Sequence, residues 1–240
     1  REAGRAVGTR AAARFAHFTL ELGGKSANIV FPDADMKQAE AGLLAGIFAA
    51  AGQTCVAGSR ALVHRKLRDD LLEILSKRAA GIRIGDPLDP STQMGPVASR
   101  QQLEKDEGMV KRALADGAEL IYGGRRANPE AFPNGYFFSP TILANVAPDS
   151  FIAQNEVFGP VLSVIPFEDE EEAIAIANGT PCGRAAGVWT LDIRRAHRGA
   201  RQRGQVPDTH QPEPSQPTQR VLVRGQATDG LRRQPCPLHV

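Results

Sequence analysis

Residues 27–64 have the sequence ANIVFPDADMKQAEAGLLAGIFAAAGQTCVAGSRALVH. The compact apolar run Ala27–Phe31 is bounded by turn residues, which predicts a buried strand. Asp33 can cap a following helix, which we expect to continue to about Ala51 and to be well buried because it is rich in alanine. Ser59–His64 predicts a second strand. This order of strand, helix and strand is typical of a parallel sheet.

The same alternation continues on both sides of this segment. Upstream, an alanine- and arginine-rich stretch predicts a helix over residues 1–16, and residues 19–22 are short enough to be only the end of a strand. Downstream, we expect helices at 67–83, 99–116, 169–178 and from 192 onward, and strands at 119–122, 136–146, 161–167 and 185–190. The sequence therefore predicts an α/β fold with a largely parallel sheet.

The composition is close to the average of globular proteins and excludes several classes. Hydrophobic residues make up 42% and charged residues 23% of the 240 residues, which argues against wholesale disorder. The formal net charge is only +2, so no global field favours a nucleic acid or an anionic membrane as a partner. No apolar run approaches the roughly 20 residues that span a bilayer, and no signal peptide is expected from the first residues.

The cysteines indicate the redox environment in which the protein works, and the histidines give no indication of a metal site. Three widely spaced cysteines favour a reducing environment, so we expect a cytoplasmic protein. The five histidines have no metal-ligand spacing with one another or with the cysteines, so no metal site is expected.

Three short segments are candidates for chemistry. Gly24, Lys25 and Ser26 have the order that ends a phosphate-binding loop, but Thr19 stands where that motif requires a glycine, which argues against a nucleoside triphosphate site. Glu156 begins a second candidate, EVFGPV. It is either part of a simple Gly-Pro turn or a carboxylate that accepts hydrogen bonds from a ribose.

Cys55 is the third candidate, in the segment GQTCVAGSR at residues 52–60. One interpretation is a buried structural cysteine, the commoner fate of an isolated cysteine. The other is a nucleophile, because a thiolate attacks carbonyl carbons well. A nucleophile that forms an acyl-enzyme also needs a general base, and Glu21 could supply one.

Together these segments resemble the NAD(P)-dependent aldehyde dehydrogenase superfamily. The motifs are ELGGKS at 21–26, GQTCVAGSR at 52–60 and EVFGPV at 156–161, and Cys55 follows Glu21 by 34 positions, similar to the family's spacing of nucleophile and base. Further stretches similar to the family are FPDAD at 31–35, GDPLDPSTQMGPV at 85–97 and NGYFFSPTIL at 134–143. The resemblance runs to about residue 198 and implies a three-layer αβα catalytic domain, incomplete in this chain.

The resemblance also implies an activity, the oxidation of an aldehyde to a carboxylic acid with NAD or NADP. The residue that matches the family's nucleophile is Cys55, which would form a thiohemiacetal and then a thioester. Glu21 matches the base that activates water to hydrolyse this thioester. The cofactor contacts implied are Gly4 beside the pyrophosphate, Leu22 and Gly23 near the nicotinamide, Glu156 at the nicotinamide ribose and Phe158 against the nicotinamide region.

Other residues near the motifs are interpreted as structural. Lys25, Ser26 and Arg60 are expected to be solvated or packing residues. Cys182 is expected to be an incidental thiol, and Arg184 would place a charge where the family has an apolar residue, at a cost to packing.

The chain also departs from the family. Family subunits are roughly twice as long, so we expect residues 1–23 to be the C-terminal remnant of a cofactor-binding domain and 24–198 an incomplete catalytic domain. Residues 199–240 are rich in Pro and Gln with scattered apolar positions, so we expect a disordered tail, and a truncated, frame-shifted gene product is our hypothesis for its origin. The arginines of this tail are not interleaved with aromatic residues, so nucleic acid is not an expected partner.

Two interpretations of function therefore remain open. In the first, the chain represents an aldehyde dehydrogenase that acts on a small aldehyde. In the second, it is a catalytically inactive remnant, at most an interaction fragment that pairs with full-length subunits. The family forms homo-oligomers, but its oligomerisation strand is not recognisable in this sequence.

Overall fold

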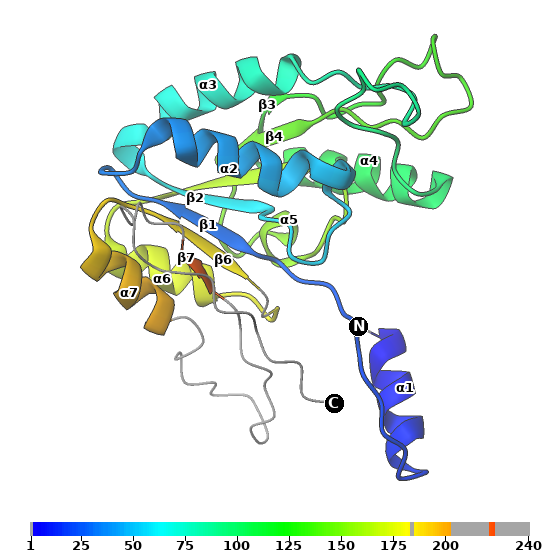
Figure 1. Cartoon of the computed structure of the whole chain (residues 1–240), viewed down its shortest axis with the longest axis horizontal. Helices are drawn as coiled ribbons and strands as arrows, with labels where there is room; N and C mark the ends of the chain where they lie inside the picture. Colours follow the sequence, from blue (N-terminus) through cyan, green and yellow to red (C-terminus); the bar gives the residue numbers. More distant parts are fainter. Residues whose placement is uncertain (1, 183–184, 203–220, 224–240) are drawn as a thin grey trace.

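The computed structural model describes residues 2–182, 185–202 and 221–223 as an α/β structure around one sheet (Figure 1). The sheet has seven strands in the order β3-β4-β5-β2-β1-β6-β7. Their bounds are β1 Ala27–Val30, β2 Arg60–His64, β3 Glu119–Tyr122, β4 Thr141–Ala144, β5 Val161–Phe167, β6 Ala186–Trp189 and β7 Val221–Val223. Every neighbouring pair is parallel except β3 with β4, so the predicted, mostly parallel α/β fold is confirmed.

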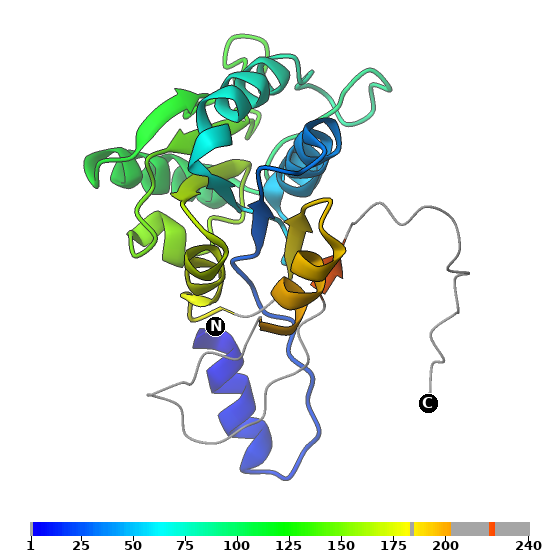
Figure 2. The ribbon, with the colours of Figure 1, turned by 90° about the vertical axis from the view of Figure 1, so that its left-hand side faces the viewer.

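Helices cover both faces of this sheet. The α-helices of the described residues are α1 Glu2–Ala12, α2 Met36–Phe48, α3 Arg68–Ala80, α4 Arg100–Ala115, α5 Phe151–Gln154, α6 Glu170–Asn178 and α7 Ile193–Gln202. Figures 1 and 2 show α2 and α3 on one face and α6 and α7 on the other, with α1 lying apart from these layers.

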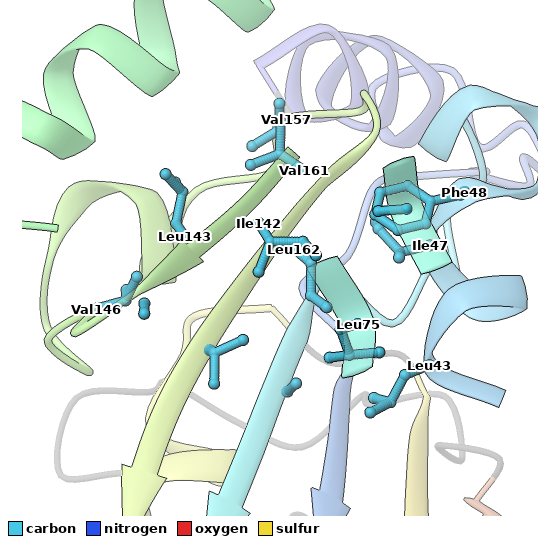
Figure 3. Close-up of a cluster of buried hydrophobic side chains, with 14 of the residues drawn as sticks. Leu43, Ile47, Phe48, Leu75, Ile142, Leu143, Val146, Val157, Val161 and Leu162 are labelled. Atoms are coloured by element: carbon cyan, nitrogen blue, oxygen red, sulfur yellow. The ribbon is translucent and has the colours of Figure 1, made fainter. Parts of the chain in front are cut away.

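The strands at the centre of the sheet are buried on both faces. In β1, Val30 packs in the cluster that contains Leu43 of α2 and Leu75 of α3, whereas Ile29 packs with Ala173 of α6. Successive side chains of a strand point to opposite faces, so covering both faces requires an unbroken apolar run. Figure 3 shows part of the larger cluster.

The start of α2 differs from the prediction. The helix begins at Met36, and its N-cap is Asp35, whose carboxylate accepts from the Gln38 N–H. Asp33 instead accepts from the Thr190 hydroxyl at 2.7 Å and from Arg195 at 2.6 Å, linking the end of β1 to the start of α7. The predicted cap at Asp33 is therefore wrong, because a contact with a distant segment uses that carboxylate.

Other boundaries also differ from the prediction. The helix expected to reach residue 16 ends at Ala12. The strand expected over 136–146 is limited to Thr141–Ala144, and residues 19–22 form no strand. The helix expected to reach Ala51 ends as an α-helix at Phe48 and continues as a 3₁₀ turn, Ala49–Gly52.

The tail follows the prediction only in part. Residues 199–202 lie in α7, and Val221–Val223 forms β7, which pairs with Ala186–Val188 of β6. The expectation of disorder is therefore wrong for both of these segments. The other tail residues from 203 to 240 lie outside the described part of the chain. Within the part that the structure describes, no helix has both the length and the apolar character needed to cross a membrane.

Candidate active site

The three motif segments meet because each one leads into a neighbouring strand. Residues 21–26, 52–59 and 156–160 directly precede β1, β2 and β5, which lie side by side in the order β5-β2-β1. These strands run parallel, so their first residues share one edge of the sheet. The Arg60 N–H donates to the Ser26 carbonyl at 3.2 Å, and the Ser163 N–H donates to the Ser59 carbonyl at 2.9 Å.

The first and third segments are joined at Glu156. The Gly24 N–H donates to Glu156 Oε1 at 3.1 Å, across 132 positions of sequence. The same carboxylate lies so close to Gly23 that an added Cβ would be 1.7 Å from Glu156 Oε2. A side chain at residue 23 is therefore incompatible with this position of the Glu156 carboxylate and would displace it.

The substitution Gly23→Ala tests this contact. Because the new methyl group would displace the Glu156 carboxylate and break its hydrogen bond with Gly24, we expect a loss of about 0.5–1.5 kcal/mol in the free energy of unfolding. Denaturant unfolding measures this loss. Gly108→Ala on α4 is the control: an added Cβ meets nothing within 4 Å there. Alanine in a helix interior should then stabilise the protein by about 0.5–1 kcal/mol. Equal effects of the two substitutions would contradict the close contact.

The second segment is joined to the third by another glycine contact. Gly52 has a φ of +73°, and an added Cβ would lie 2.1 Å from the Gly159 carbonyl oxygen. The turn that follows is closed by the Ala57 N–H, which donates to the Thr54 carbonyl at 2.9 Å, and it presents Cys55 partly exposed. A partly exposed thiol does not match the interpretation of Cys55 as a buried structural cysteine.

Gly4, Glu21 and Leu22, which were also predicted to belong to the site, differ in their exposure to solvent. Glu21 and Leu22 are exposed on the irregular segment between α1 and β1. Gly4 is buried against Leu22, since an added Cβ would lie 2.8 Å from Leu22 Cδ2. The base role of Glu21 therefore remains a prediction.

Phe158 has an unusual backbone conformation. Its φ is +63°, in the left-handed region that residues other than glycine rarely adopt, and the residue is 36% exposed although Val157 and Gly159 on either side are buried. A partly exposed aromatic ring, a carboxylate and a glycine lie together here, and such a set fits a flat ring joined to a ribose. These residues are therefore compatible with the nicotinamide end of a cofactor.

Lys25 and Arg60, which were expected to be solvated or packing residues, both lie buried behind these segments. The Arg60 guanidinium donates to the carbonyl oxygens of Lys25, Ile176 and Ala177, which is a structural role. The Lys25 Nζ has no hydrogen-bond partner among the described residues. Burial and the nearby Arg60 lower the pKa of Lys25 to about 7, while the Glu156 carboxylate opposes the shift.

The other residues expected to be structural are less informative. Ser26 is buried, and its hydroxyl accepts from the Ala185 N–H at 3.4 Å. Cys182 is a partly exposed free thiol. Arg184 lies outside the described residues.

Asp106 on α4 carries a fully buried carboxyl group and is not among the residues predicted from the sequence. Burial raises the pKa of Asp106 to about 7, and a hydrogen bond from Gln102 opposes the shift. A signal was present, because Asp106 follows Leu103 by three positions and precedes Val110 by four, on the buried side of the helix. An aspartate on this otherwise apolar side of the helix is the feature that could have identified Asp106 as unusual.

A cavity of about 310 Å³ adjoins the Cys55 turn. It lies between α2 and β6 and is lined by Asn28, Val56, Gly58 and Trp189 together with small residues. Among residues 2–182, 185–202 and 221–223, no cluster of three His, Cys, Asp or Glu side chains could hold a metal ion.

Comparisons with known proteins agree on one family. A family model described as "Aldehyde dehydrogenase family" matches residues 1–206. The betaine aldehyde dehydrogenase of Brucella anthropi is 47% identical over 195 residues, which cover 81% of this chain and 40% of that protein. The protein of the same name from Brucella ovis is 45% identical over 194 residues, with the same two coverages.

Solved structures give the same result. The betaine aldehyde dehydrogenase of Staphylococcus aureus in complex with NAD⁺ matches with a TM-score of 0.81 and 40% identity, over 84% of this chain and 40% of that one. The NAD⁺ complex of an aldehyde dehydrogenase from Bacillus cereus matches with a TM-score of 0.80 and 40% identity, over 83% and 40% of the two chains. The chain thus spans about 40% of the length of the relatives that it matches.

Proposed function

The chain belongs to the aldehyde dehydrogenase family, and from this premise we propose that it carries the catalytic residues of an enzyme that oxidises an aldehyde to a carboxylic acid with NAD or NADP. The observation that supports the proposal most strongly is the meeting of the three motif segments at one edge of the sheet, where Gly24 binds Glu156 and Gly52 packs on Gly159.

Cys55 and Glu21 are the proposed catalytic residues. The Cys55 thiolate attacks the aldehyde carbon and forms a thiohemiacetal. When bound, the nicotinamide supplies the acceptor for the hydride that leaves this carbon. The resulting thioester on Cys55 is hydrolysed by a water molecule from which Glu21 takes a proton, which releases the acid and the thiolate. The partial exposure of Cys55, beside a cavity, is compatible with this attack.

The proposed cofactor contacts are Gly4, Leu22, Gly23, Glu156 and Phe158. Glu156 would accept hydrogen bonds from the ribose hydroxyls, because its Oε1 already accepts from Gly24 and thereby keeps the carboxylate in place. Gly23 leaves the backbone free of a side chain at this point. Phe158 offers an exposed ring face to the nicotinamide region.

The remaining expectations are proposals with less direct support. Residues 1–23 are assigned to a cofactor-binding domain and 24–198 to the catalytic domain, which agrees with α1 lying apart from the sheet (Figure 1). The boundary proposed at 198 falls within α7, Ile193–Gln202. The whole protein is proposed to be a cytoplasmic homo-oligomer without nucleic-acid partners. Betaine aldehyde, for which the Brucella relatives are named, is the first substrate to test.

The experiment compares turnover in three variants of the chain, with betaine aldehyde and propanal as substrates and NAD or NADP as oxidant. Cys55→Ala should lower formation of reduced cofactor by at least about 10³-fold, as expected when a nucleophile is removed. Cys182→Ala is the matched control and should retain turnover. Glu21→Gln should keep a first burst of reduced cofactor but slow the steady state, because only hydrolysis of the thioester needs the base.

Each outcome decides between the two interpretations. Equal turnover of Cys55→Ala and Cys182→Ala would contradict the proposed nucleophile. No turnover by the unmodified chain, folded and supplied with either cofactor, would favour the alternative of an inactive remnant.

A further inference from the structure

The turn that carries Phe158 is held from α4 by two side chains. The Gln102 amide Nε2 donates to the Val157 carbonyl at 3.0 Å and to Asp106 Oδ1 at 2.7 Å. The Asp106 carboxyl group packs directly on Gly159, where an added Cβ would be 2.4 Å from each of its oxygens. Gln102 and Asp106 therefore contact the residues on both sides of Phe158.

Phe158 itself needs such support. A φ of +63° is unfavourable for an aromatic residue, and such conformations persist only where the surrounding structure imposes them. The contacts from α4 fix the backbone immediately before and after Phe158. They are thus in the right place to impose its conformation and to direct its ring outward.

The contact between Asp106 and the turn depends on whether the Asp106 carboxyl group is charged. Within the described part of the chain, its Oδ2 is buried and has no hydrogen-bond partner. Burial raises the pKa of Asp106 to about 7, and the negative charge of Glu107 on the same helix adds to this shift, whereas the hydrogen bond from Gln102 and the positive charge of Lys105 oppose it. The turn packed against it carries Glu156, whose carboxylate is directed to Gly24.

The other neighbour of α4 adds no compensating charge. The short helix α5, which packs against α4, has the sequence FIAQ and contains no charged residue. A carboxylate in this position would lack a cationic partner and would attract water between α4 and the turn. A protonated carboxyl group avoids that penalty.

We propose that Gln102 and Asp106 are positioning residues that hold Phe158 in its left-handed conformation, and that protonated Asp106 holds the turn more tightly than the carboxylate does. The use of the Phe158 ring for the cofactor rests on the proposed function. The contacts by which Gln102 and Asp106 of α4 hold this turn do not depend on the proposed function.

The test follows the backbone amide resonances of Phe158 and Gly159 by NMR in the full chain between pH 5.5 and 8.5. In the unmodified chain these resonances should shift with a midpoint near pH 7. Asp106→Asn keeps the size of the side chain and its bond with Gln102 but cannot ionise, so the midpoint should disappear and the low-pH positions should persist. Glu104→Gln, an exposed position on the same helix, is the control and should titrate like the unmodified chain.

Two further variants test whether Gln102 and Asp106 hold Phe158 in its conformation. Asp106→Leu and Gln102→Leu both remove the hydrogen bond between residues 102 and 106, so the backbone shifts of Phe158 should move away from left-handed values at every pH. The proposal is overturned if Asp106→Asn retains the midpoint, if the unmodified chain shows none, or if Phe158 keeps its conformation in both leucine variants.

A cofactor titration separates this proposal from the proposed function. NAD affinity should fall about 5–10-fold between pH 6 and 8 in the unmodified chain and stay level in Asp106→Asn, if Phe158 contacts the cofactor. If Phe158→Ala leaves NAD affinity unchanged while the turn still titrates, the cofactor role of Phe158 fails and the positioning role of Asp106 stands.

Discussion

Replacing Arg60 by methionine is expected to lower the free energy of unfolding by about 3–5 kcal/mol, because it removes a buried charged group from several acceptors at once. The guanidinium donates to the Lys25 carbonyl at 3.2 Å and to the Ile176 and Ala177 carbonyls at 2.8 Å each. The last two carbonyls belong to the final turn of α6, where helical carbonyls lack partners within the helix. Methionine fills similar volume but leaves these oxygens without this donor.

Denaturant unfolding of Arg60→Met measures this loss, and Arg65→Met is the matched control. Arg65 is more than half exposed and pairs with Glu168 on the surface, so its replacement should cost at most about 1 kcal/mol. Arg60→Lys should also destabilise the protein, since lysine keeps the charge but cannot reach several carbonyls with one planar group. An Arg60→Met variant as stable as Arg65→Met would show that Arg60 contributes little to the attachment of α6.

Replacing Lys25 by methionine is expected to have the opposite sign and to stabilise the protein by about 1–4 kcal/mol near pH 7. The Lys25 Nζ is fully buried and has no hydrogen-bond partner among the described residues, while Arg60 adds repulsion. Burial thus makes the charged form unfavourable. Methionine retains the packing of the aliphatic chain and removes the amine.

The pH dependence identifies the cause of this gain. The pKa of Lys25 is lowered from 10.5 to about 7 in the folded protein, so between these values the unfolded chain binds more protons at this position. The contribution of Lys25 to stability therefore rises with pH from about 7 to 10.5, and the advantage of Lys25→Met should shrink over that range. Below pH 7 the amine is charged in both states and the advantage should be constant.

Unfolding at pH 6.5 and 9.5 measures this difference. Lys77→Met is the control, since Lys77 is exposed beside Glu73 and its replacement should change stability by no more than about 0.5 kcal/mol at either pH. A gain for Lys25→Met that is equal at both pH values would contradict a buried, weakly basic amine.

The local pattern of the sequence was enough to predict most of the elements. β5 has the predicted bounds Val161–Phe167, and α6 begins directly after its predicted first residue, Asp169, which is the N-cap. Such features depend on apolar periodicity and on capping residues close in sequence. The cap at Asp33 failed for the opposite reason, since its carboxylate bonds to residues 190–195.

Some features of the candidate site could likewise be predicted from the sequence, and others could not. The residue types at Cys55, Glu21, Glu156 and Phe158 pointed to a chemistry, and their roles remain proposals. The buried state of Lys25 and Asp106 could not be predicted with the same ease, because lysine and aspartate are usually solvated. Burial depends on which segments cover a side chain, and that information lies in residues far away in the sequence.

The sequence by itself determined the strand and helix order, the parallel sheet and the three motifs, since each of these depends on residues within a few positions of one another. Only the tertiary structure decided that Gly24 binds Glu156, that Gly52 packs on Gly159, and that Asp106 supports the turn of Phe158. The physical reason is the order of strands β5, β2 and β1 in the sheet, which brings segments more than 100 positions apart to one edge. At this edge, the glycines leave room for the segments to approach each other, and Asp106 is buried among them. Both features depend on residues far away in the sequence, which no local pattern specifies.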